Sequence, residues 1–174
     1  MKWITAAALT CMVLVSAPTQ ALIGETALQR KVDRSFSAIL IDTPFSRVRR
    51  ALVKDSRSCD ADGECEWRDV SGVRHTFWGE LRDETLVLKI VDASEFRRKP
   101  IKALGIGQAR SKAQVIAQIR KFDHRIVLDC DPKRASGNVG YQECSAMLGP
   151  GWIEVGFDRN GWLTKVRFDG YQYT

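Results

Sequence analysis

The spacing of apolar residues along the chain predicts two amphipathic helices. The first begins at Thr43-Pro44, a capping residue followed by proline at the first helical position. Its apolar residues recur at helical spacing: Phe45, Val48 and Leu52. The second begins near Ser111, and its apolar residues share one face: Val115, Ile119 and Phe122. Each helix has a polar opposite face, so each is expected to pack on another element.

A β-hairpin is predicted near the C-terminus, where two apolar-rich segments flank Asn160-Gly161. Asn-Gly is the strongest short signal for a two-residue hairpin turn, and such a turn fixes the register. On one face it pairs mostly apolar residues: Phe157 with Thr164, Val155 with Val166, and Ile153 with Phe168. On the other face it pairs opposite charges: Glu154 with Arg167.

The same register separates the two tryptophans of this hairpin. Trp162 shares a face with Val166, which predicts that it belongs to the core. Trp152 falls on the polar face with Glu154 and Arg167, which makes it a candidate contact residue for a partner. Aromatic residues and arginines are the usual anchors of binding surfaces.

A second sheet region spans Glu66 to Val91, with turns expected at Ser71-Gly72 and Asp83-Glu84. A two-residue turn at Ser71-Gly72 pairs Asp69 with Arg74. Taken together, these elements predict an α+β fold in which amphipathic helices pack on one face of an antiparallel sheet.

The order of these features is the same in both halves of the chain, which suggests a tandem repeat of a helix-plus-sheet unit. Residues 22–95 form the first α+β unit and residues 96–174 the second, joined as one compact domain or as a tandem pair. The apolar segment Phe36–Ile41 aligns with Ile101–Ile106, and each is expected to be a strand that precedes a helix.

The N-terminus has the layout of a secretory signal peptide over residues 1–21. A lone Lys2 precedes the apolar run Thr5–Val15, and Ala21 provides a small residue for cleavage. The run is shorter than the roughly 20 residues of a membrane span, so no span is expected after cleavage. Cys11 lies inside the run and lacks the context of a lipidated cysteine. These features predict a periplasmic or secreted bacterial protein.

Four cysteines remain after cleavage: Cys59, Cys65, Cys130 and Cys144. An even number in an exported chain indicates two disulfides, for which three connectivities are possible. The pairs Cys59–Cys65 and Cys130–Cys144 are favoured because each closes a short polar loop. The alternative, a zinc site, is disfavoured by the cysteine spacing and by an oxidising compartment.

The basic balance of the chain favours an anionic partner. The net charge is +6, and removal of Lys2 with the signal peptide leaves +5. Arg97 and Arg98, within a charged connector, are candidate partner-binding residues for a protein or an anionic envelope polymer. Lys99 of the same run and the arginines of the first predicted helix could also bind phosphate or carboxylate polymers. An ordinary solvated face is the alternative for these charges, and nucleic acid is not expected because no recognised binding motif is present.

Catalytic and metal-binding motifs are weak in this sequence. His75 could act with Asp69 or Asp83, although neither His75 nor His124 lies in a metal-binding spacing. The carboxylates between the first two cysteines could hold calcium, but their spacing does not match an EF-hand loop: Asp60, Asp62 and Glu64. We therefore expect no catalytic residue, no metal and no cofactor.

The succession of helix, cysteine pair, aromatic strand and Asp-x-Asn-Gly hairpin resembles the β-lactamase-inhibitor-protein-like fold. It is also similar to the small outer-membrane-assembly lipoproteins. The residues that carry the likeness are Ile106–Ile119, Cys130/Cys144 and Phe157–Phe168, and in the first half Ile41–Leu52 and Cys59/Cys65. The resemblance implies helices on a continuous antiparallel sheet whose concave face receives a partner.

The function expected from the sequence is therefore that of an exported, non-catalytic binding module. It would recognise a protein or an anionic envelope component. The alternatives are an inhibitor of a cell-wall or antibiotic hydrolase, a small hydrolytic enzyme and a structural envelope protein.

Overall fold

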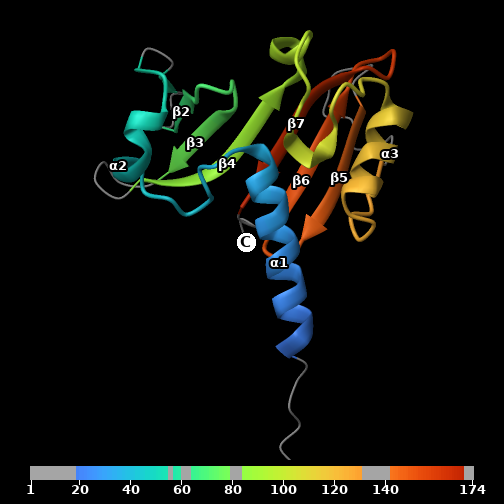
Figure 1. Cartoon of the computed structure of the whole chain (residues 1–174), viewed down its shortest axis with the longest axis horizontal. Coiled ribbons are helices and arrows are strands. Elements are labelled where there is room, and N and C mark those ends of the chain that lie inside the picture. The colour runs from blue at the N-terminus through green and yellow to red at the C-terminus, as the bar shows by residue number, and fades with distance from the viewer. Residues whose placement is uncertain (1–18, 55–56, 60–63, 79–83, 131–141, 171–174) are drawn as a thin grey trace, which may run out of the picture.

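The computed structural model describes residues 19–54, 57–59, 64–78, 84–130 and 142–170, with side chains from residue 27 onward. Most of the predicted signal peptide, including Cys11, lies outside these ranges. The described residues form one seven-stranded antiparallel sheet with three α-helices and several 3₁₀ helices (Figure 1). This arrangement confirms the α+β class. None of the described helices has the length and apolar character needed to cross a bilayer.

The sheet is continuous across both halves of the chain, in the order β1-β2-β3-β4-β7-β6-β5. The central pair is β4 with β7, so a strand from each half meets in the middle. The strand bounds are β1 Ser58–Cys59, β2 Cys65–Arg68, β3 Arg74–Trp78, β4 Thr85–Asp92, β5 Gln142–Leu148, β6 Gly151–Phe157 and β7 Leu163–Asp169.

Three α-helices accompany the sheet: α1 (Thr19–Phe36), α2 (Phe45–Val48) and α3 (Lys112–Phe122). The 3₁₀ helices are η1 (Arg49–Ala51), η3 (Ala93–Phe96) and η4 (Ala103–Gly105). In Figure 1, α1 and α3 lie over the part of the sheet built from β5, β6 and β7, whereas α2 lies beside β2 and β3.

The main core forms where α1 and α3 cover the sheet. Its helical members are Leu28, Val32 and Phe36 of α1 with Val115 and Ile119 of α3. The sheet supplies inward residues that are fully buried: Ile153, Val155, Phe157, Val166 and Phe168. The rings of Phe36 and Phe168 lie 5.9 Å apart, which joins the end of α1 directly to β7. An N-terminal helix therefore completes the core of the C-terminal half.

A smaller core lies beneath α2. Phe45 packs on Trp67 and edge-on against Phe77, at centroid distances of 5.0 and 5.3 Å. Buried Leu52 and Leu86 belong to the same cluster. Ile41 contacts both cores, so the two clusters are neighbours in one structure.

The helix predicted from Ser111 is confirmed as α3. Ser111 occupies the N-cap position, Val115 and Ile119 are buried, and Phe122 packs on the main core. The helix predicted after Thr43-Pro44 begins at Phe45 but is only four residues long. Pro44 bridges to Thr85, and Leu52 bridges to Asp69. These two pairings with the sheet hold the segment at both ends and prevent the helix from continuing.

The two apolar segments expected to be strands are not strands. Phe36 is the last residue of α1, because Leu28, Val32 and Phe36 continue a helical spacing of four. In the second segment, Leu104 and Gly105 have positive φ values of 54° and 65°, which a strand does not allow. Each segment contributes buried residues, among them Phe36 and Ile39 in the first and Ile101, Leu104 and Ile106 in the second. The apolar pattern therefore indicated core residues correctly but did not indicate a strand.

The two hairpin loops predicted at Ser71-Gly72 and Asn160-Gly161 are each one residue longer than predicted, so Arg68 rather than Asp69 pairs with Arg74. The loops contain three residues, between Asp69 and Val73 and between Asp158 and Trp162. In each loop the aspartate carboxylate accepts backbone N–H bonds from the residues two and four positions later. In each loop the last residue is a glycine with positive φ: Gly72 at 94° and Gly161 at 75°. A three-residue loop ending in a left-handed glycine is a common hairpin connection, and here the aspartate selects it.

The longer loop changes the face on which Trp162 lies. Val155 pairs with Val166 and Glu154 with Arg167, as predicted, but Phe157 pairs with Leu163. Thr164 is the extra residue, so the alternation reverses beyond it. Leu163 turns inward, and Trp162 is 54 % exposed. The prediction that Trp162 is a core residue is therefore wrong.

The predicted disulfides are both present. Cys59–Cys65 joins paired positions of β1 and β2. Cys130–Cys144 joins the segment after α3 to β5, one residue from the bridge between Asp129 and Ser145. Each bond therefore crosses an antiparallel pairing and holds an outer strand of the sheet.

Candidate binding surface

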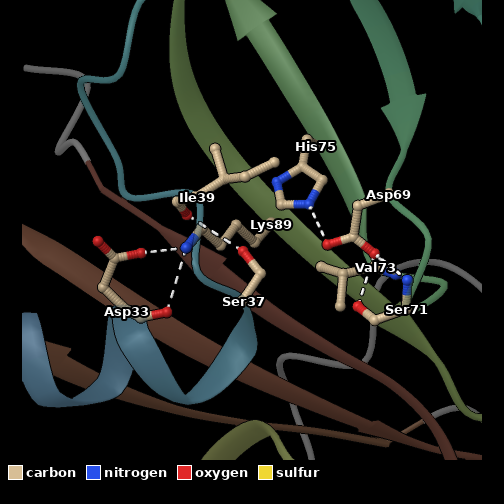
Figure 2. A network of polar contacts seen from close by, with 8 residues as sticks. All are labelled: Asp33, Ser37, Ile39, Asp69, Ser71, Val73, His75 and Lys89. Carbon is tan, nitrogen blue, oxygen red and sulfur yellow. Dashed lines mark hydrogen bonds and ion pairs between the residues drawn. The ribbon is translucent and has the colours of Figure 1, made fainter. Parts of the chain in front are cut away.

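A network of buried charges lies between α1 and the first half of the sheet (Figure 2). Lys89, on β4, has no exposed surface. Its Nζ forms an ion pair with Asp33 Oδ1 and donates to the Asp33 carbonyl at 3.1 Å. Burial lowers the pKa of the Lys89 ammonium, and the Asp33 carboxylate opposes that shift. The pair attaches α1 to the centre of the sheet.

His75 and Asp69 form a second buried pair in the same network (Figure 2). His75 Nε2 lies 2.9 Å from Asp69 Oδ2, and Asp69 Oδ1 also accepts bonds from the Ser71 hydroxyl and the Ser71 and Val73 amides. Burial raises the pKa of Asp69, but hydrogen bonds from His75 and Ser71, the charge of His75 and the Val73 amide outweigh it. The pKa of Asp69 is therefore lowered.

Of the two partners considered for a catalytic His75, the structure brings Asp69 into hydrogen-bond distance, but the pair is buried. The His75 side chain has no exposed surface, so no substrate reaches the ring in this conformation. Asp83 lies outside the described residues, as do Asp60 and Asp62 of the calcium alternative. Within the described ranges, no group of three His, Cys, Asp or Glu side chains is arranged to hold a metal ion.

The face of the sheet opposite the main core carries charged side chains of β6 and β7; we call it the open face. Its central residues are Trp152, Glu154, Lys165, Arg167 and Asp169. Lys165 Nζ lies 2.7 Å from Glu154 and 3.2 Å from Glu143. Arg167 lies 3.1 Å from Asp169. Each of these cations is therefore balanced by a carboxylate.

Trp152 lies on the open face, as predicted, and belongs to its charge network. The Arg167 guanidinium lies over the indole at 5.2 Å from the ring centroid. Burial raises the pKa of Asp169, and bonds from Arg167 and the Trp152 indole partly oppose the shift. Trp152 is half-buried by these neighbours, so it is less accessible than Trp162.

A hollow of about 680 Å³ lies at one end of the open face, between η3 and the β6–β7 hairpin. Its lining includes Arg97, Arg110 and the exposed ring of Trp162. Arg74 and Lys165 also line it, but Arg74 is paired with Glu66 at 3.0 Å. The one carboxylate in the lining, Asp92, accepts bonds from the Ser94 amide and hydroxyl.

Arg110 is held rigidly at this hollow by backbone oxygens. Its two terminal nitrogens donate to four carbonyls at 2.7–2.9 Å, those of Gly107, Ala109, Phe96 and Lys99. Carbonyl dipoles orient the guanidinium but do not cancel its charge. The bonds to Phe96 and Lys99 also fix the turn that carries Arg97 and Arg98.

The predicted residues Arg97 and Arg98 are both exposed on that turn. Neither forms an ion pair with any described carboxylate, and the same holds for four further cations: Lys99, Arg110, Lys112 and Arg159. Gly161 of the hairpin lies beside Lys112, and the Lys112 amide donates to the Gly161 carbonyl. We call this cluster the basic end: Arg97, Arg98, Lys99, Arg110, Lys112, Arg159 and Trp162.

The sequence indicated three members of the basic end, Arg97, Arg98 and Lys99, but not the other four. Arg97 and Arg98 stand out as a charged run, whereas Arg110 and Trp162 join them only through the folded chain. One available signal was Asp158, whose carboxylate sets the loop length that turns Trp162 outward. The comparisons with family models, with curated proteins and with solved structures found no match.

Proposed function

We propose that this protein is a non-catalytic binding module that holds an anionic partner at its basic end. The observation that carries the proposal is an imbalance of charge between two neighbouring surfaces. On the open face, Lys165 and Arg167 have carboxylate partners within 3.2 Å. At the basic end, Arg97 and Arg110 have none among the described residues. A guanidinium such as that of Arg97 binds a carboxylate or phosphate through two parallel hydrogen bonds. Arg110, whose terminal N–H groups all donate to carbonyls, contributes its charge and its Nε–H.

We propose in addition that the protein is exported from the cytoplasm. The two disulfides are consistent with an oxidising environment, and the N-terminal sequence has the composition of an export signal. We place the protein in the periplasm or outside the cell, where its partner would be an anionic component of the envelope. The resemblance of the sequence to β-lactamase-inhibitor-like proteins supports a binding module rather than an enzyme.

We also propose that the chain is a tandem repeat of two helix-plus-sheet units. In its favour, the β2–β3 and β6–β7 hairpins use the same loop, in which an aspartate caps three residues that end in glycine, whereas the β5–β6 hairpin turns through two residues, Gly149 and Pro150. The sheet register also places His75, Lys89 and Phe168 in one row, on the face that α1 covers. We infer from these features that the helices share one face, and that the two halves are related units joined through β4 and β7.

A charge-reversal experiment tests the proposed function. The oxidised protein, expressed with its own N-terminal segment, is incubated with isolated envelope material, and the bound fraction is measured at increasing salt concentration. Arg97→Glu/Arg98→Glu should lower retention strongly, and wild-type retention should fall as salt rises because screening weakens exposed charges.

The matched control is Arg49→Glu/Arg50→Glu. This pair is also exposed and adjacent in sequence, and it changes the net charge by the same amount. It lies on η1, beside the smaller core. Equal loss of retention in both variants would show that only net charge matters, and the proposed site would then be wrong.

A further inference from the structure

We infer that the hollow at the basic end binds an acidic oligosaccharide, with one sugar ring against Trp162 and its carboxylate on Arg97 and Arg110. This inference rests on the proposed function and names the class of partner. It depends on three features: the exposed indole, the preoriented guanidinium and the arrangement of charges beyond the hollow.

The Trp162 indole provides a flat apolar surface in the wall of the hollow. It is 54 % exposed, and its own backbone amide is fixed by Asp158 at 2.8 Å. No described residue accepts a bond from its indole N–H. A large aromatic ring held in this way makes a stacking surface for a ring-shaped ligand at little entropic cost. The indole N–H also remains able to donate to a ligand hydroxyl.

Arg110 provides a cation that does not need to reorganise on binding. Four backbone carbonyls hold its two terminal nitrogens, which leaves the Nε–H without an acceptor among the described residues. Arg97 lines the same hollow from the turn that Arg110 fixes. Two guanidinium groups on adjoining walls suit one carboxylate that projects from a ring.

The size of the hollow and the charges around it point to a polymer of small charged rings. A volume of about 680 Å³ lies in the range of sites for small molecules. Further cations continue outside it in two directions: Arg98 and Lys99 on the turn, and Lys112 and Arg159 near the hairpin. A chain with one carboxylate per ring would place successive charges along this path.

Two other anionic partners fit the hollow less well. Single-stranded nucleic acid usually stacks successive bases on several aromatic side chains, and Trp162 is the one exposed aromatic residue in the described lining. An anionic membrane surface is broad and is contacted by protruding residues, whereas Arg110 and Trp162 line a concavity. Both partners serve as comparison arms of the test.

The test is a calorimetric titration of the full oxidised protein with a polyuronate hexamer. A neutral glucose hexamer, inorganic phosphate, a hexanucleotide and phosphatidylglycerol vesicles are titrated in parallel. We expect saturable binding of the hexauronate and weaker binding of every other probe. Trp162→Ala should weaken hexauronate binding roughly tenfold, while Trp162→Phe should retain most of it because the ring is kept.

The outcomes separate the ligand class from the proposed function. If Arg97→Glu/Arg98→Glu weakens hexauronate binding and Trp162→Ala does not, the basic end binds anions but the saccharide inference is wrong. Tighter binding of the nucleotide or of the vesicles overturns the inference in the same way. If neither variant differs from wild type, the inference and the proposed function both fail. Trp152→Ala, on the open face, should leave the affinity unchanged.

Discussion

Lys89 has no exposed surface, and its charge depends on a carboxylate that comes from a different element of the fold. The hydrogen bond from Lys89 Nζ to the Asp33 carbonyl spans 56 residues of sequence. Burial of two charges is costly, and the cost is offset only while both partners are present. At the scale of single residues, the attachment of α1 to the sheet therefore depends strongly on this pair.

Replacing Lys89 with methionine should destabilise the fold by about 3–5 kcal/mol, because the Asp33 carboxylate remains buried without its counter-ion. The double variant Asp33→Asn/Lys89→Met should recover part of that loss. Urea denaturation monitored by fluorescence gives the free energy of unfolding. The control is Lys54→Met, at an exposed lysine. A Lys89→Met variant as stable as wild type would contradict this role.

Asp69 should make the stability of the protein sensitive to acid. Its pKa is lowered in the folded state, so the stability that its ionised form contributes is present above its ordinary value of 3.8. This contribution is lost as the pH falls through the lowered pKa. Asp69→Asn should cost about 1–3 kcal/mol at neutral pH, and its difference from wild type should shrink below pH 3.8.

The measurement for Asp69 is the free energy of unfolding at steps from neutral pH into the acid range. Asp129→Asn, at an exposed aspartate, is the control and should follow the wild-type curve. A constant difference between Asp69→Asn and wild type across the whole acid range would show that the carboxylate charge has no part in the effect.

At the scale of elements, Arg110 clamps the turn that follows η3 to the segment that leads into α3. The Phe96 and Lys99 carbonyls belong to the first side, and those of Gly107 and Ala109 belong to the second. Among the described residues, the turn is closed by one backbone hydrogen bond of its own, from the Lys99 amide to the Phe96 carbonyl at 3.1 Å. Its position at the hollow therefore depends on the guanidinium.

Arg110→Lys should loosen this turn, because an ammonium group cannot reach four carbonyls in two directions. We expect a loss of about 2 kcal/mol in unfolding free energy and faster hydrogen exchange at the Lys99 amide. Arg120→Lys, at an exposed arginine on α3, is the matched control and should change neither. Unchanged exchange at Lys99 in Arg110→Lys would contradict the clamp.

The elements that the sequence predicts well are those whose signals are local. The helix α3 and the pairing of Val155 with Val166 follow from apolar spacing and from a turn nearby in sequence. The two disulfides follow from short loops between cysteines. The three-residue length of the β2–β3 and β6–β7 loops also has a local signal, since an aspartate precedes each loop and a glycine ends it. Asn160-Gly161 taken alone favours a shorter turn.

At the scale of the whole molecule, the remaining features depend on contacts between distant segments. When α1 packs on the sheet, Phe36 contacts Phe168 and Lys31 pairs with Asp123. The N-terminal helix therefore packs against residues of the C-terminal half. Lys89 shares a face with Val87 and Val91, a pattern that marks it as buried, but nothing nearby in sequence identifies Asp33 as its partner. The hollow is likewise lined by three segments that are distant in sequence: η3, Arg110 and the β6–β7 hairpin. No local sequence pattern predicts that these segments lie side by side.

The central claim is that the basic end, rather than the neutralised open face, receives the anionic partner. Each surface contains one tryptophan whose indole N–H gives a separate nuclear magnetic resonance signal: Trp162 at the basic end and Trp152 on the open face. Titration of the ¹⁵N-labelled protein with the hexauronate should shift the Trp162 indole signal and leave the Trp152 signal in place. A shift of Trp152 with Trp162 unchanged would contradict the claim.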